Sequence, residues 1–262
     1  MSEPSFEFGV VCEALADQRT ACELADRTLR EAVEWLDDPV VLDSVRRWRG
    51  LEDRADEPFL KWAHVKDAFK SSSSFAHGGV RSIFGPFNGE AAQPDALSAR
   101  KALLLFAALR RCPDAVLLVR DSDADPDRIA AQGLKQVREK YRWPFKVVIG
   151  MAHPKREAWV LAGFVPRNAG EESRLQELRA RLSLDPITAS HELAASEHGA
   201  KKDIKRALDE LTQEDWERER QCLEETPLAV LEQRGQKNGL AEFLKEVRER
   251  LVPLLNGAGR AG

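Results

Sequence analysis

Three short apolar runs in the first 150 residues predict buried β-strands. They are residues 6–12 (FEFGVVC), 115–119 (AVLLV) and 145–149 (FKVVI). The second run has five uncharged aliphatic residues between polar ones, which is the pattern of a strand covered on both faces. Strands of this kind are typical of parallel α/β sheets, in which ligands collect at the carboxyl ends of the strands.

The segments between these runs have apolar residues at helical spacing. After the first strand one face of a predicted helix carries Ala21, Leu24, Ala25, Leu29, Ala32, Val33 and Leu36. Asp17 lies where it would cap this helix. Two further helices are predicted at residues 97–109 and 127–141. Strands that alternate with helices predict a parallel sheet flanked by helices, and right-handed crossovers bring the carboxyl ends of its strands to one edge.

Two regions depart from this alternation. Residues 37–96 contain several prolines and a run of four serines, and they predict an inserted loop region with one short strand near residues 59–65. After residue 165 the pattern predicts helices only, at residues 171–182, 201–211, 214–223 and 240–251. We therefore expect an α/β domain at residues 1–165 and a helical C-terminal region at residues 166–262.

Composition restricts the partners and the compartment. With 262 residues, of which 43% are hydrophobic, the chain can bury a sizeable core. The net charge of -4 gives no global attraction to nucleic acid, so such a partner would need a local basic patch or a metal ion. The four cysteines form no Cys-x-x-Cys pair, which argues against a zinc site and fits a reducing cytoplasm. The sequence shows neither a signal peptide nor the roughly 20 apolar residues of a membrane span, so we expect a cytoplasmic protein without a membrane partner.

An acidic cluster follows the second strand directly. Asp121 and Asp123 form an Asp-x-Asp sequence, and in an extended segment their carboxylates would lie on one side, about 7 Å apart along the backbone. Like charges held there repel unless a cation compensates them, and carboxylate oxygens suit Mg²⁺ or Mn²⁺. We also expect one aspartate of this run to cap the helix that Pro126 begins.

The acidic residues occur in an order that resembles the Toprim domain. Glu13 closes the first strand, Asp17 follows it by four residues, and Asp121 and Asp123 close a later strand. The Toprim domain occurs in topoisomerases, bacterial primases, ribosomal-RNA maturases and the overcoming-lysogenization-defect nucleases. The resemblance covers roughly residues 6 to 165. The chain departs from the family pattern at Ala14, where the family usually has glycine, and in the long segment between the two motifs.

A second segment extends the resemblance. Residues 153–161 (HPKREAWVL) look like the Glu-Ala-Trp-Leu signature of small, stand-alone Toprim-like proteins of bacterial phage defence. By this resemblance Glu157 completes a second shell around the metal, although a glutamate in the first turn of a helix is an equal alternative. Lys155 is either a cationic stabiliser of the transition state, as in the related nucleases, or a solvated surface lysine.

The resemblance implies a metal-dependent nuclease that cleaves phosphodiester bonds of DNA or RNA in anti-phage defence. Glu13, Asp121 and Asp123 would be catalytic, and the same three with Asp17 and Glu157 would bind Mg²⁺ or Mn²⁺. The ion would polarise a phosphoryl oxygen and stabilise the leaving alkoxide. Glu13 would either share a second ion or act as a general acid or base.

Basic residues near these motifs are candidates for contacts with nucleic acid. They are Lys155, Arg156, Lys201, Lys202 and Lys205. The last three precede or begin a predicted helix in which acidic residues interleave, so an ordinary salt-bridged surface is the alternative.

Two other functions fit part of the pattern. In the first, the chain is a non-catalytic interaction subunit that binds nucleic acid or a partner ATPase encoded nearby, and its C-terminal helices are the docking region. Alternatively it would be a metal-dependent glycosyltransferase that uses Asp121 and Asp123, which leaves Glu13 without a role.

Overall fold

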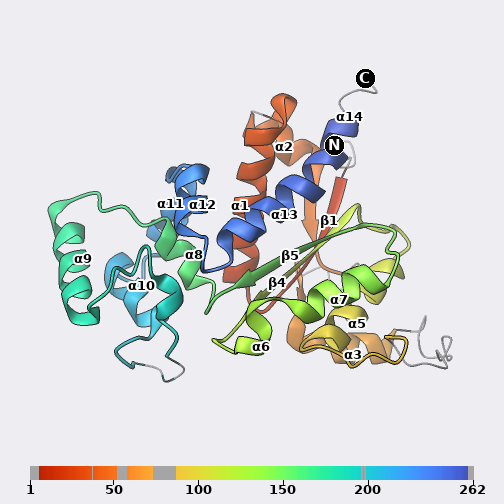
Figure 1. Ribbon diagram of the computed structural model, residues 1–262. Coiled ribbons are helices and arrows are strands. Elements are labelled where there is room, and N and C mark those ends of the chain that lie inside the picture. Colours follow the sequence, from red (N-terminus) through yellow and green to blue (C-terminus); the bar gives the residue numbers. More distant parts are fainter. Residues whose placement is uncertain are drawn as a thin grey trace.

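The computed structural model describes residues 6–36, 38–51, 58–72, 87–195, 197 and 199–258 (Figure 1). Its centre is a five-stranded parallel sheet in the order β2-β1-β4-β5, with β3 also paired to β1. The strands are β1 (Phe6–Cys12), β2 (Arg46–Arg49), β3 (Leu60–Lys61), β4 (Ala115–Asp121) and β5 (Lys146–Ala152). The predicted α/β class, a parallel sheet flanked by helices with a helical C-terminal region, is confirmed.

The two short strands β2 and β3 follow one another along the same side of β1. β2 pairs with the first half of β1 and β3 with its last two residues, while β4 occupies the other side of β1. The prediction of a strand at residues 59–65 was too long, because the chain turns at Trp62 into a 3₁₀ turn (Trp62–His64) and helix α3 (Val65–Ser71). The predicted loop region also contains helix α2 (Pro39–Val45), and its residues 52–57 and 73–86 lie outside the described part.

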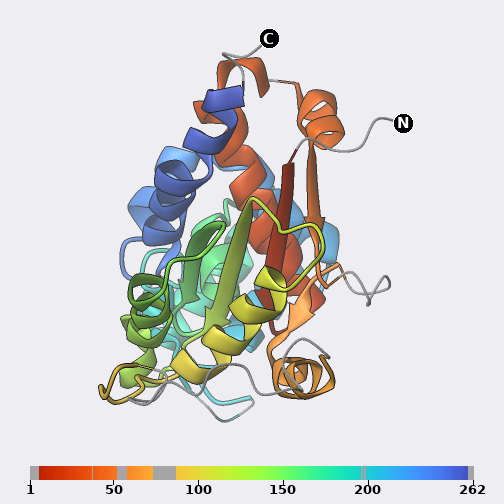
Figure 2. The ribbon, with the colours of Figure 1, turned by 90° about the vertical axis from the view of Figure 1, so that its right-hand side faces the viewer.

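Helices cover both faces of the sheet (Figure 1, Figure 2). α1 (Leu15–Ala32) and α13 (Leu240–Arg250) pack on one face, and α3, α5 (Ala96–Ala107) and α7 (Gln132–Lys140) pack on the other. Alternate residues of β4 serve the two cores: Leu117 and Val119 face α1, and Val116 and Leu118 face α5. This is why the β4 run is apolar throughout.

The single helix predicted at residues 127–141 is divided in two. α6 (Pro126–Ile129) is separated from α7 by Ala131, whose φ of 53° is left-handed and interrupts the helix. Asp125 caps α6 by accepting the backbone N–H of Asp127 at 3.0 Å, as expected of one aspartate in this run.

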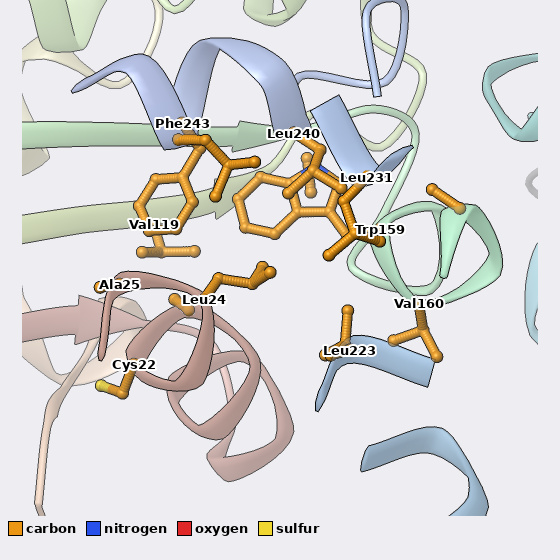
Figure 3. Packing of buried hydrophobic residues seen from close by; sticks show 14 of the residues in the cluster. Cys22, Leu24, Ala25, Val119, Trp159, Val160, Leu223, Leu231, Leu240 and Phe243 are labelled. Carbon is orange, nitrogen blue, oxygen red and sulfur yellow. The ribbon is translucent and has the colours of Figure 1, made fainter. Parts of the chain in front are cut away.

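The C-terminal region is helical and closes the core of the sheet. Helix α8 (Glu157–Ala162) leads into this region, whose remaining helices are α9 (Ala169–Leu182), α10 (Ile204–Thr212), α11 (Trp216–Glu225), α12 (Leu228–Arg234) and α14 (Val252–Ala258). Short 3₁₀ turns lie at Ser190–Glu192 within it and at Glu34–Leu36 after α1. Trp159 of α8 stacks on Phe243 of α13 at a centroid distance of 5.0 Å (Figure 3). Its Nε1 donates to the carbonyl oxygen of Asn238 at 2.9 Å. The sheet and the C-terminal helices therefore share one continuous hydrophobic core. Across the described residues, we find no helix with the length and apolar character needed to cross a membrane.

The junction of α8 and α11 leaves no room for a side chain at Gly163. A Cβ atom there would lie 2.2 Å from the backbone carbonyl oxygen of Cys222. We expect Gly163→Ala to lower the free energy of unfolding by about 2 kcal/mol, because the two backbones must separate. In Gly257→Ala, at an exposed glycine of α14 whose Cβ would meet no atom within 4 Å, we expect no loss. Urea denaturation of both variants measures this difference, and equal losses would contradict the close packing.

Candidate acidic site at the carboxyl edge of the sheet

The sheet brings the two predicted acidic motifs to the same edge. β1 and β4 are parallel neighbours, with Val10 paired to Leu117 and Val11 to Leu118. Glu13 follows the last residue of β1, and Asp121 is the last residue of β4. Parallel strands end on one edge, so residues that are more than 100 positions apart in the sequence become neighbours.

Three carboxylates gather on the face of this edge that α1 and α8 cover. Asp121 accepts the backbone N–H of Arg156 at 2.9 Å, and Asp17 accepts the backbone N–H of Ala14 at 2.8 Å. Glu157, the first residue of α8, is 9% exposed. Desolvation, then the charges of Asp17, Glu157 and Glu13, raise the pKa of Asp121 to about 8. Desolvation is also the main cause that raises the pKa of Asp17.

The Glu157 carboxylate is only partly compensated. Its Oε1 lies 3.7 Å from Nη2 of Arg156. Its Oε2 is buried and accepts no hydrogen bond from the described residues. A buried carboxylate oxygen without a donor is costly, and a cation would remove that cost. A cation bound at this oxygen and the Asp121 carboxylate would offset their negative charge.

The second aspartate of the Asp-x-Asp sequence does not join this group. The expectation that both carboxylates lie on one side of an extended segment is wrong, because the backbone turns left-handed at Asp123 (φ 51°) and Ala124 (φ 59°). Asp123 is exposed, and its Oδ2 lies 3.4 Å from Nη1 of Arg128. A left-handed backbone is unfavourable for alanine, although aspartate tolerates it better than most residues, so the sequence pattern did not show this turn.

Glu13 lies between the acidic group and a pair of arginines. Its side chain is exposed, and partial desolvation raises its pKa. The positive charge of Arg120 lowers this pKa, and the negative charge of Asp123 raises it by a smaller amount. Arg120 lies 3.1 Å from Asp95 Oδ1, and Arg128 lies 3.3 Å from Asp95 Oδ2. Asp95 thus forms ion pairs with two guanidinium groups near Glu13, although its Oδ2 accepts no hydrogen bond from the described residues. No motif in the sequence pointed to Asp95, since it precedes a helix far from both acidic motifs.

The predicted basic residues differ in their availability. Arg156 is buried, and its Nη1 lies 2.8 Å from Oε2 of Glu219 on α11. The guanidinium group links α8 to α11, so an exposed contact of Arg156 with nucleic acid is not what the structure shows, and its prediction as a nucleic-acid residue stays a prediction. Lys155 is half-buried beside it. The three remaining lysines, Lys201, Lys202 and Lys205, are exposed; the first two lie in a turn, and only Lys205 lies in α10.

The donor atoms fit a magnesium ion that is held by few protein ligands. Within the described ranges, no three His, Cys, Asp or Glu side chains are close enough to one another to form a complete metal centre. Mg²⁺ commonly binds through one or two carboxylates and keeps several waters or substrate phosphates as its other ligands. Asp121, which is desolvated among like charges, and Glu157, with its unpartnered oxygen, have the required chemistry.

Comparison of the chain with protein-family models, with curated proteins and with solved structures gives no match. The resemblance to the Toprim domain therefore depends on the quoted residues.

Proposed function

We propose that this chain is a Mg²⁺- or Mn²⁺-dependent nuclease that acts on DNA or RNA. The observation that carries the proposal is the position of Asp121, at the carboxyl end of β4, next to the buried Glu157, whose Oε2 accepts no hydrogen bond from the described residues. Asp121 and Glu157 would hold the ion, with Asp17 and Glu13 adding negative charge around it. When bound, the ion would polarise a phosphoryl oxygen and stabilise the leaving alkoxide.

The other residues of the edge have roles that do not depend on the ion. Glu13 is exposed, and its raised pKa makes it a better acceptor for the proton of an attacking water. Arg120 and Arg128 would stabilise the charge on the phosphate in the transition state. Asp95 would hold both guanidinium groups in place through its two oxygens.

The test is cleavage of single- and double-stranded DNA and RNA by the purified protein. We expect cleavage with Mg²⁺ or Mn²⁺ and none with EDTA. Glu13→Gln and Glu157→Gln should each lower the rate by about 100-fold or more, because each removes a charge from the reacting edge. Glu139→Gln, an exposed glutamate on α7, is the matched control and should keep the wild-type rate. Activity that is unchanged in Glu13→Gln and Glu157→Gln would refute the proposal.

The turn of Asp123 away from the acidic group, toward Arg128, supports one alternative, a subunit that binds nucleic acid or a partner ATPase without cleaving. Tight binding of nucleic acid that stays intact with either metal would favour this alternative. Cleavage that appears only when an ATPase encoded beside this gene is added would instead make the chain the nuclease of a two-component system. A role in anti-phage defence would then follow from protection of cells by the wild type and not by Glu157→Gln.

A further inference from the structure

A cavity of about 440 Å³ lies between α1 and α11, next to the acidic edge. Gln18, Arg19 and Thr20 of α1 line one side, Trp216 of α11 lines the other, and Arg156 lies between them and the edge. The volume is in the range of small-ligand sites. The proposed nuclease chemistry, which uses carboxylates and the arginines near Asp95, assigns no role to this cavity.

Arg156 connects the cavity to Asp121. Its backbone N–H donates to Asp121 Oδ1 at 2.9 Å, while its guanidinium group lines the cavity and contacts Thr20 Oγ1 at 3.4 Å. Gln18 also follows Asp17 directly in α1. A ligand in the cavity would therefore contact residues next to the acidic edge. These are Arg156, which donates to Asp121, and Gln18, which follows Asp17 in the sequence.

The wall of the cavity offers an aromatic ring and a guanidinium group. Arg19 lies over the Trp216 ring at 5.1 Å and Arg156 at 5.9 Å. Arg19 is exposed, and no carboxylate of the described part of the chain forms an ion pair with it. Nucleobases stack on indole rings and on guanidinium planes, whichever base is present. A planar base would take the place of Arg19 against the indole ring, and the displaced, exposed Arg19 side chain would then be available for a phosphate.

The charges of the lining favour a neutral group inside the cavity. The charged residues that line it are Arg19, Arg156 and Arg220 together with Glu23, Asp26, Glu219 and Glu224. Most of these are already paired: Glu219 with Arg156 at 2.8 Å, Glu224 with Arg220 at 2.7 Å, and Asp26 with Arg46 at 2.6 Å. Carboxylates slightly outnumber guanidinium groups in this lining. A phosphate deep in the cavity would therefore be repelled, whereas an uncharged base would not be.

We propose that this cavity binds one nucleobase of the nucleic-acid substrate next to the cleaved phosphate, with the base against Trp216 and the adjacent phosphate on Arg19. The proposal rests on the proposed nuclease function, because the base belongs to its substrate. It adds that the substrate is single-stranded or locally unpaired at this position, since a base inside a duplex cannot enter a cavity.

The experiment measures binding without cleavage. Single-stranded 8-mers of DNA and RNA of one sequence are titrated against the full-length protein in EDTA by fluorescence anisotropy. A series of DNA 8-mers, each lacking one base at a different position, is titrated in parallel. The variants are Trp216→Ala, Trp216→Phe, which keeps an aromatic ring, and Trp143→Ala as a control on the far side of the sheet.

We expect Trp216→Ala to weaken binding of the intact 8-mers about 10-fold, because one stacked base is lost. Trp216→Phe should recover most of the affinity, and Trp143→Ala should not change it. For one or two adjacent abasic 8-mers, Trp216→Ala and the wild type should bind equally, a result that a purely structural role of Trp216 would not produce. The ratio of DNA to RNA affinity shows which polymer the site prefers.

The proposal would be overturned if Trp216→Ala bound every 8-mer as the wild type does, or if it weakened binding of all abasic 8-mers equally. The nuclease function fails in a different way, through absence of cleavage by the wild type with either metal. If the wild-type protein binds the 8-mers through Trp216 but does not cleave them, the base-binding site is supported and the nuclease function is refuted.

Discussion

Asp121→Asn is expected to lower the rate of nucleic-acid cleavage about 1,000-fold or more and, at the same time, to make the metal-free protein more stable at alkaline pH. The loss of rate follows because the neutral amide could no longer supply an anionic oxygen to the ion that the edge would bind. The gain in stability follows because Asp121 is desolvated beside the charges of Asp17, Glu157 and Glu13. An amide has almost the same shape as the carboxylate and cannot add to this repulsion.

The pH dependence has a definite sign. The pKa of Asp121 is about 8 in the folded protein against an ordinary value of 3.8. The folded state therefore keeps a proton that the unfolded state releases, and the stabilising contribution of the protonated group is lost as the pH rises from about 4 to about 8. At pH 9 we expect the free energy of unfolding of Asp121→Asn to exceed that of the wild type by about 2 kcal/mol, and at pH 5 by much less.

Thermal unfolding in EDTA at pH 5 and pH 9 measures this difference, which corresponds to about 5 °C in Tm at pH 9. Asp127→Asn is the matched control, because Asp127 belongs to the same acidic run but is exposed. It should keep the wild-type Tm at both pH values. Adding Mg²⁺ should raise the Tm of the wild type and not that of Asp121→Asn. A variant that is less stable than the wild type at pH 9 would show that Asp121 is compensated within the protein.

Trp159→Ala is expected to lower the free energy of unfolding by about 4 kcal/mol. Trp159 is 1% exposed and lies among Phe243, Leu240 and Leu231 of the C-terminal helices (Figure 3). Its removal would leave a cavity where α8 joins the sheet to α13. The Asn238 carbonyl oxygen, which also accepts the backbone N–H of His153, would lose one of its two donors. Both changes act on the core that the sheet and the C-terminal helices share.

Urea denaturation, followed by circular dichroism, measures the loss. Trp159→Phe keeps the stacking on Phe243 and loses the hydrogen bond, so about 1–2 kcal/mol is expected for it. Trp143→Ala, at a half-buried tryptophan before β5, should cost less than Trp159→Ala. A loss below about 1 kcal/mol in Trp159→Ala, or a second unfolding transition, would show that the C-terminal helices unfold independently of the sheet.

The strands differ in how readily the sequence reveals them. β1 and β4 are apolar throughout because both of their faces are covered, and such a run is recognisable without any partner. β2 has the sequence RRWR and was missed, because it is an edge strand whose charged side chains are compensated by distant residues. Arg46 pairs with Asp26 at 2.6 Å and Arg49 with Glu7 at 2.5 Å. The division between α6 and α7 was missed for a related reason, since Ala131 in a left-handed conformation has no signal in its own residue type.

The sequence by itself determined that Glu13 and Asp121 share an edge, because buried parallel strands leave their carboxyl ends together whatever the loops between them do. Only the tertiary structure decided which carboxylates group around Asp121. Asp123 turns to Arg128, Glu157 is buried with an oxygen unpartnered by the described residues, and Arg156 is held inside by Glu219, which lies 63 residues later. The local pattern of apolar residues indicates which faces of a strand or helix are covered. The direction of a polar side chain depends instead on the partner that the rest of the chain brings to it.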